Sequence, residues 1–242
     1  MKRLSLLLDD ITYIRSALNS DAYDPVQLGI LGETAGANGL TCTYLGNDRG
    51  FRERDLRVLR EIRKTFLNLR IPIEQEAVRL AMSLMPDMVT FIDNKGASPR
   101  AASAIDPAIQ MESLSQALPD LQANNISISV LIQPEINDLK QISKLPVDYI
   151  EFDATTYTSA PDINIEMVSL DKLKSSAMAA SKLGLGINCS GGIRYDHIPA
   201  LAQIPNLEDI TVGGQFIQRA LWVGIERAVN EALQLIRHWG TE

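Results

Sequence analysis

The sequence predicts an α/β protein with a single (β/α)8 TIM barrel that spans residues 1–242 as one domain. Three observations favour this fold. The chain has 242 residues, close to the usual size of such a barrel. Short apolar runs alternate eight times with longer amphipathic segments. The first apolar run is not followed by the Gly-x-Gly-x-x-Gly of a dinucleotide-binding protein, which disfavours the alternative, an open doubly wound sheet.

The eight expected strands are short, mostly apolar on both faces and rich in Leu, Ile and Val. Strands that are buried on both sides of a parallel sheet have this pattern. The runs are residues 4–8, 39–44, 67–71, 88–92, 126–132, 149–152, 185–189 and 209–212. Two of them contain the chain's two cysteines, Cys42 and Cys189. We expect both cysteines to be buried, reduced thiols rather than a disulfide or a metal pair.

Amphipathic segments between and after these strands predict eight helices. They cover residues 24–35, 53–65, 74–84, 107–123, 135–143, 165–183, 195–203 and 215–237. The first begins with Asp24-Pro25, a good cap and first-turn pair. Two of the helices run directly into a glycine, at Gly36 and Gly184, as helices often do at their carboxyl ends.

Composition and charge narrow the range of partners and locations. Hydrophobic residues make up 45% of the chain and charged residues 22%, the ordinary mix of a soluble globular protein. A formal net charge of -7 argues against a general nucleic-acid or anionic-membrane partner. The apolar run near the amino terminus is cut short by Asp9 and Asp10, unlike a signal peptide. No apolar run is long enough to span a bilayer, so we expect a cytoplasmic protein.

The strongest functional pattern is a pair of glycine loops at the carboxyl ends of the last two strands, where barrels carry their sites. Each loop has two consecutive glycines, and the second loop leads straight into the final helix. Glycines let the backbone approach a phosphate and turn N–H groups toward it, and a helix amino terminus adds a favourable dipole. The alternative is two tight turns. The glycines expected to bind the phosphate of a small molecule are Gly191, Gly192, Gly213 and Gly214.

Charged residues at the other strand ends form a second candidate set. They are Asp9, Asp93 and Asp153, expected at the barrel mouth after strands one, four and six, and Arg70 from strand three. Two interpretations stay open. The carboxylates either perform acid–base chemistry or bind a divalent metal, or Arg70 neutralises them in a structural ion-pair network. The two histidines, His197 and His238, do not end strands, so no histidine acid–base or zinc site is expected. Although the carboxylates leave the metal interpretation open, our prediction for this chain includes no metal and no cofactor.

The sequence resembles pyridoxine 5'-phosphate synthase, the barrel enzyme that closes the ring of vitamin B6, nearly from end to end. The resemblance rests on residues 22–27, 33–39, 48–49, 54–60, 68–69, 149–151, 179–185, 188 and 212–213. It implies a TIM barrel, assembly through outer helices, and a reaction that condenses deoxyxylulose phosphate with aminoacetone phosphate. That reaction needs general acids and bases, which the family supplies as histidines and a glutamate.

At those positions this sequence departs from the family. The family's Asn-x-Asp-His after strand one is Leu7-Leu8-Asp9-Asp10 here, so only Asp9 matches. The family's other histidines, an arginine and a glutamate correspond, in chain order, to Thr43 (His), Leu45 (Arg), Gly50 (His), Arg70 (Glu), Gly191 (His) and Gly214 (His). The glycines whose counterparts touch phosphate, Gly192 and Gly213, are retained. Phosphate binding is therefore expected to persist, while the proton-transfer groups are replaced.

Two classes of function follow from this pattern. One is an enzyme, which performs the family reaction with other residues or a different reaction with Asp9, Arg70, Asp153 and Tyr157. The other is a non-catalytic, divergent paralogue that binds pyridoxine phosphate or a related phosphate ester. In either case the resemblance implies a homo-oligomer. The sequence places Trp222 in the last, outer helix and Trp239 near its end. Trp222 either contacts a neighbouring subunit or packs on the chain's own barrel, and we expect Trp239 to contact a neighbour or the rim of the barrel.

Overall fold

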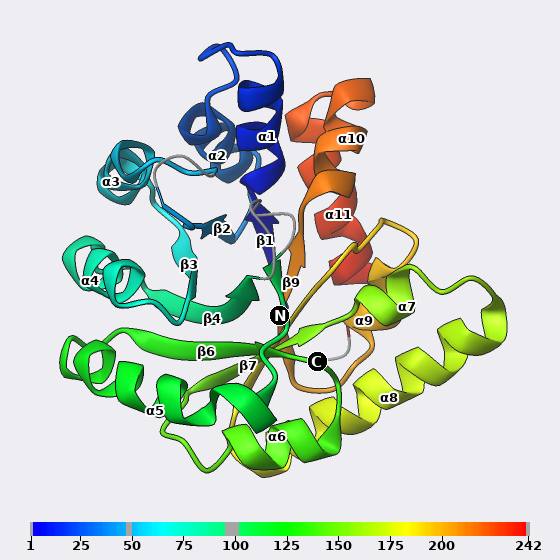
Figure 1. The fold of residues 1–242 in the computed structure, drawn as a ribbon. Helices are drawn as coiled ribbons and strands as arrows, with labels where there is room; N and C mark the ends of the chain where they lie inside the picture. Colours follow the sequence, from blue (N-terminus) through cyan, green and yellow to red (C-terminus); the bar gives the residue numbers. More distant parts are fainter. Residues whose placement is uncertain (1, 47–49, 95–101, 241–242) are drawn as a thin grey trace.

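The structure is a computed structural model that describes residues 2–46, 50–94 and 102–240. Eight parallel strands close into a barrel with helices around it, a TIM barrel (Figure 1). Neighbouring strands follow the order β3-β2-β1-β9-β8-β7-β6-β4, and the pairing of β3 with β4 closes the ring. The fold class predicted from the eightfold alternation is confirmed.

All eight predicted barrel strands are present, with bounds that shift by a residue or two. They are β1 (Arg3–Leu7), β2 (Gly39–Thr43), β3 (Phe66–Pro72), β4 (Met88–Asn94), β6 (Ser127–Ile132), β7 (Tyr149–Asp153), β8 (Gly186–Ser190) and β9 (Leu207–Val212). A two-residue strand that the sequence did not predict, β5 (Ala102–Ser103), pairs antiparallel with the end of β4.

The helices in the described residues differ from the prediction at three places. They are α1 (Asp9–Ala17), α2 (Pro25–Thr34), α3 (Glu53–Ile62), α4 (Gln75–Leu84), α5 (Pro107–Ala123), α6 (Ile136–Ile142), α7 (Thr155–Thr158), α8 (Ile163–Lys182), α9 (Ile198–Ala202), α10 (Gly214–Val223) and α11 (Ile225–Trp239). The sequence did not predict α1 and α7. The single helix expected over residues 215–237 is wrong, because Gly224 has a φ of 83° and separates α10 from α11.

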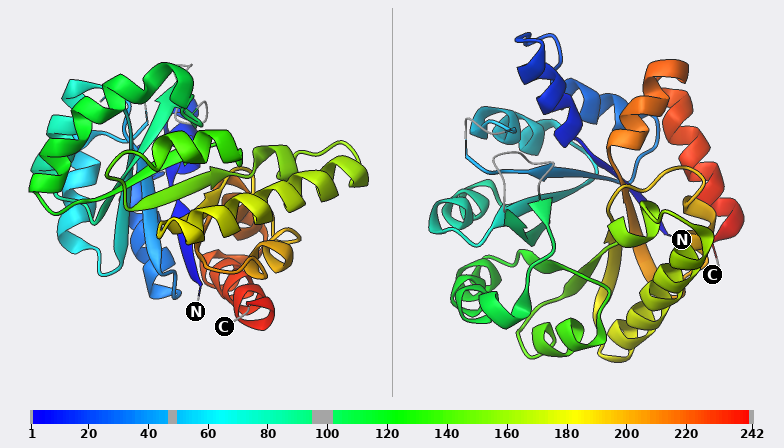
Figure 2. Two further views of the ribbon diagram at one scale, coloured as in Figure 1. Left: turned by 90° about the horizontal axis from the view of Figure 1, so that it is seen from below. Right: turned by 45° about the vertical axis from the view of Figure 1, so that its right-hand side comes forward.

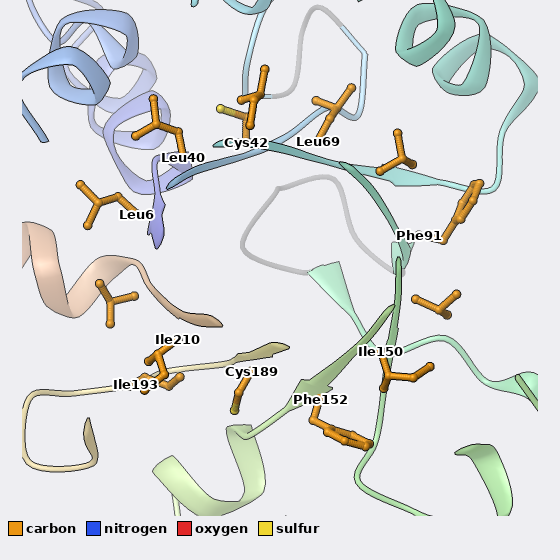
Figure 3. Close-up of a cluster of buried hydrophobic side chains, with 14 of the residues drawn as sticks. Leu6, Leu40, Cys42, Leu69, Phe91, Ile150, Phe152, Cys189, Ile193 and Ile210 are labelled. Carbon is orange, nitrogen blue, oxygen red and sulfur yellow. The ribbon is translucent and has the colours of Figure 1, made fainter. Parts of the chain in front are cut away.

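An apolar layer between the strands and the helices forms the core. Figure 3 shows side chains such as Leu6, Phe91 and Ile150 that point away from the barrel axis, and all three are fully buried. Cys42 and Cys189 belong to this layer and are both free. The prediction of two buried thiols is therefore confirmed.

The inside of the barrel is polar, although the interiors of such barrels are commonly filled by branched apolar side chains. Successive residues of a strand face opposite sides, so the neighbours of the core residues point inward. Buried polar residues at these alternate positions include Thr41, Asn68, Arg70, Thr90, Ser129, Glu151 and Asn188. A polar interior places hydrogen-bonding groups directly beneath the mouth of the barrel.

The helix α8 is the longest of the described helices. In Figure 2, α8 runs along the barrel and extends past its edge. Within the described residues, no helix combines the length and apolar character that a membrane crossing requires.

Candidate functional site

A cavity of about 300 Å³ opens at the carboxyl ends of the barrel strands. This volume is at the lower end of the roughly 300–1,000 Å³ typical of small-molecule sites. Its lining is Leu7, Asp9, Asp10, Arg70, Ala102, Leu131, Asp153, Thr155, Ser190, Gly191, Gly192, Ile193, Thr211, Gly213, Gly214 and Gln215. The fold thus gathers the four glycines predicted to bind phosphate with three of the four predicted charged residues.

The two glycine loops present free hydrogen-bond donors to this cavity. Gly191 and Gly192 have φ angles of 102° and 59°, in the left-handed region that favours glycine. Among the described residues, no acceptor is bonded to the backbone N–H groups of Gly191, Gly192, Gly214 or Gln215. The last two residues begin α10, whose amino end carries a partial positive charge. Unbonded N–H groups in the lining of a cavity, two of them at a helix amino end, can bind an oxyanion.

Asp153, at the end of β7, fills the space beside Gly191. A Cβ atom on Gly191 would lie 2.4 Å from Asp153 Oδ1 and 2.8 Å from Thr155 Oγ1. The Asp153 carboxylate accepts hydrogen bonds from Thr155 N at 2.9 Å and from Gln133 Nε2 at 3.1 Å. A side chain at position 191 therefore requires the Asp153–Thr155 turn to move.

Asp9 is the first residue of α1 and is buried at the wall of the cavity. Its carboxylate accepts hydrogen bonds from Thr43 N at 2.8 Å and from Thr43 Oγ1 at 2.6 Å. Burial raises the pKa of Asp9 to about 6, although the bonds from Thr43 and the positive charge of Arg70 oppose the shift. A carboxyl group with such a pKa can donate and accept protons near neutral pH.

Arg70 points to the inside of the barrel, where we expected it to contact Asp9, Asp153 or a ligand anion. Its guanidinium forms a buried ion pair with Glu151 of β7, not with Asp9 or Asp153. Arg70 lies in β3 and Glu151 in β7, which are not neighbours in the barrel, and both residues are on the inward face of their strand. Within the described residues, Arg70 Nε and Glu151 Oε2 have no hydrogen-bond partner. Arg70 lines the cavity and retains capacity to bind an anionic or carbonyl oxygen.

Asp93, which was predicted at the mouth, and Tyr157, a candidate for a different reaction, do not line the cavity. Asp93 does not line the cavity; its Oδ1 accepts a bond from Gln110 of α5 at 3.3 Å. It shares a strand face with Phe91, which packs in the apolar layer, so the alternation of β4 turns Asp93 toward the helices. Tyr157 is buried in α7 with its ring 5.0 Å from that of His197, and burial raises its pKa to about 12.

The remaining sequence predictions are located as follows. His197 is buried at the start of α9 and accepts a bond from Arg194 N, and His238 lies in α11 beside Trp239; neither lines the cavity. Gly50 also lies apart from the cavity lining, and its carbonyl accepts a bond from Arg15. Residues 47–49 and 95, which follow predicted strands in the sequence, lie outside the described residues. In the described ranges, no group of three or more potential metal ligands comes together.

Sequence reasoning did not assign a role to Asp10 or Glu151, which the structure brings to the site. Asp10 lines the cavity, and a Cβ atom on Gly214 would lie 3.1 Å from its Oδ2. Glu151 lies beneath the cavity as the partner of Arg70. The sequence could have revealed Glu151, because it is an acidic residue within the apolar run of a buried strand, and such a residue needs a partner of opposite charge.

The fold is shared with several solved structures. KGPDC from Streptococcus mutans superimposes with a TM-score of 0.66 at 11% identity and covers 99% of both chains. Phosphoribosyl anthranilate isomerase from Thermococcus kodakaraensis has a TM-score of 0.64 at 10% identity, covering 98% of this chain and 99% of that chain. At such low identity these similarities support the TIM-barrel fold alone.

Similarity in sequence identifies the family as well as the fold. A pyridoxine 5'-phosphate synthase of Geobacter sulfurreducens is 32% identical over 238 residues, which cover 98% of this chain and 100% of that protein. The protein of the same name from Geobacter metallireducens is 33% identical with the same coverage. The family described as "Pyridoxal phosphate biosynthesis protein PdxJ" matches residues 4–238. The chain therefore belongs to the PdxJ family of vitamin B6 biosynthesis, as the resemblance predicted.

Proposed function

We propose that this chain, acting as one domain, binds pyridoxine 5'-phosphate or a related phosphate ester in the cavity. The observation that carries the proposal is the convergence of both glycine loops on one cavity, with free N–H groups from each loop. A phosphate against these donors would also benefit from the dipole of α10. The residues proposed to hold the phosphate are Gly191, Gly192, Gly213 and Gly214.

We further propose that the family's condensation reaction does not proceed here at the family's usual rate. That reaction needs proton transfers, and general acids and bases contribute roughly 100-fold or more each. Thr43, which corresponds to a family histidine, donates its hydroxyl to Asp9. Gly191, which corresponds to another, has its side-chain space filled by Asp153 and Thr155. At these two positions, no histidine or other group with a pKa near neutral takes the place of the family's histidine among the described residues.

A second candidate function is a different reaction at the same cavity. The pKa of Asp9, raised to about 6, favours it, because this carboxyl group could act as a general acid or base on a bound ester. Arg70 would then stabilise negative charge on the reacting oxygen. Asp153 suits a positioning role better, since Thr155 and Gln133 already donate to its two oxygens.

Calorimetric titration tests the binding proposal. We expect pyridoxine 5'-phosphate to bind at millimolar concentration or below, and unphosphorylated pyridoxine to bind more weakly because it lacks the group that the loops hold. Absence of binding at several millimolar would contradict the proposal. Gly192→Ala should weaken the binding of pyridoxine 5'-phosphate, because Gly192 lines the cavity. Gly184→Ala is the matched control and should not weaken it, because Gly184 also has a positive φ angle but does not line the cavity.

An activity assay separates the two classes of function. With deoxyxylulose phosphate and aminoacetone phosphate as substrates, and the Geobacter sulfurreducens protein as positive control, we expect turnover to be lower by several orders of magnitude. Turnover within tenfold of that control would overturn the proposed loss of the family reaction. Should any phosphate ester be converted, Asp9→Asn is expected to abolish conversion while binding persists.

A further inference from the structure

The carboxylate of Asp10 stands at the amino end of α10. Asp10 is the second residue of α1 and lines the cavity. A Cβ atom on Gly214, the first residue of α10, would lie 3.1 Å from Asp10 Oδ2 and 3.3 Å from both Oδ1 and Cγ. The whole carboxylate group therefore fills the space that a side chain would need at Gly214, where α10 begins.

This position is one that an anion is expected to occupy. The amino ends of α1 and α10 lie side by side in Figure 1, and the two helices are in contact. Each amino end carries a partial positive charge, so a negative group between them is stabilised by both. The N–H groups of Gly214 and Gln215, which have no acceptor among the described residues, are the donors that a ligand phosphate would also need at this end of the cavity.

A second observation shows that the cavity is nevertheless suited to an anionic ligand. Arg70 is at least nine-tenths buried, lines the same cavity, and has no hydrogen-bond partner for Nε within the described residues. An anionic ligand could therefore enter, but its phosphate would lie within a few ångströms of Asp10. Two negative charges at such a separation repel each other measurably even with the screening of water.

We propose that Asp10 sets the anion selectivity of the cavity, because its carboxylate competes with a ligand phosphate for the amino end of α10. The affinity for phosphate esters is lowered by this competition, whereas the affinity for ligands without a phosphate is not. The inference rests on the proposed function, since it concerns the same cavity, but it names a different residue and a different measurement.

Charge removal at position 10 tests the inference. The probes are inorganic phosphate and pyridoxine 5'-phosphate, titrated into the whole chain, Asp10→Asn and Asp171→Asn. Asp171 is a matched control, because its side chain is 75% exposed in α8 and its substitution removes the same charge far from the cavity. We expect Asp10→Asn to bind both probes about tenfold more tightly or better. Binding to Asp171→Asn and the affinity of Asp10→Asn for unphosphorylated pyridoxine should be unchanged.

The possible outcomes separate this inference from the proposed function. Equal affinity of the original chain and Asp10→Asn for phosphate, or weaker binding by Asp10→Asn, overturns the inference while phosphate binding stands. Failure of both proteins to bind either probe overturns the inference and the proposed function together. Because Asp10 lies in the first turn of α1, thermal unfolding and a second variant, Asp10→Ser, show whether any loss of binding comes from misfolding.

Discussion

The buried ion pair between Arg70 and Glu151 offers a sharp test of the structure. Their side chains are 5% and 1% exposed, so neither charge is solvated if the other is removed. Breaking a buried pair from one side costs about 3–5 kcal/mol, because an uncompensated charge is left in the interior. A domain of this kind is stable by only about 5–15 kcal/mol, so Glu151→Gln or Arg70→Met should remove a large part of the free energy of unfolding.

Urea denaturation followed by circular dichroism measures this effect. With a slope of about 3 kcal/mol per molar urea, each single variant should lower the unfolding midpoint by about 1 M or more. The double variant Arg70→Met with Glu151→Leu is the control, because removing both charges can be nearly neutral. The reasoning is refuted if each single variant costs less than about 1 kcal/mol, or if the double variant costs the sum of the two.

Three further predictions follow. Gly191→Ala should destabilise the fold and weaken phosphate binding, since φ is 102° and the new Cβ would meet Asp153; an unchanged melting temperature and affinity would contradict this. The pKa of Asp9 rises from 3.8 to about 6 on folding, so protonated Asp9 contributes about 3 kcal/mol to the free energy of unfolding below pH 3.8. This contribution is lost as the pH rises through 6. Urea denaturation at a series of pH values should show that Asp9→Asn lacks this part of the pH dependence. We propose that Leu221 and Trp222 of α10, which are 75% and 79% exposed, contact a second subunit. Light scattering should then give a mass above the 26.7 kDa of one chain, and a mass equal to that of one chain would contradict this proposal.

Local sequence patterns were sufficient for most of the fold. The strands are continuous apolar runs and the long helices are amphipathic, and both signals lie within a few neighbouring residues. The break at Gly224 was missed because a glycine inside an amphipathic pattern is compatible with a continuous helix until its φ is known. The helix α1 was missed because Asp9 and Asp10 follow the strand immediately and leave no loop to mark its start.

The site was predicted less completely, for a different physical reason. The glycine loops were found because their position at strand ends is a local feature. The partner of Arg70 was not, because Glu151 faces it from a strand that is not its neighbour in the sheet. Likewise, Asp10 and Gly214 belong to opposite ends of the chain, and only the pairing of β1 with β9 brings them together. Asp153 and Gly191 follow the neighbouring strands β7 and β8, but the strand pattern does not show that Asp153 takes the space beside Gly191.

The most direct test of the central claim is a crystal structure of the chain with pyridoxine 5'-phosphate. We expect the phosphate group to lie in the cavity within hydrogen-bond distance of the backbone N–H groups of Gly191, Gly192 and Gly214. Phosphate density bound at another surface, or a cavity that stays empty in crystals soaked at several millimolar ligand, would show that the glycine loops do not form the phosphate site.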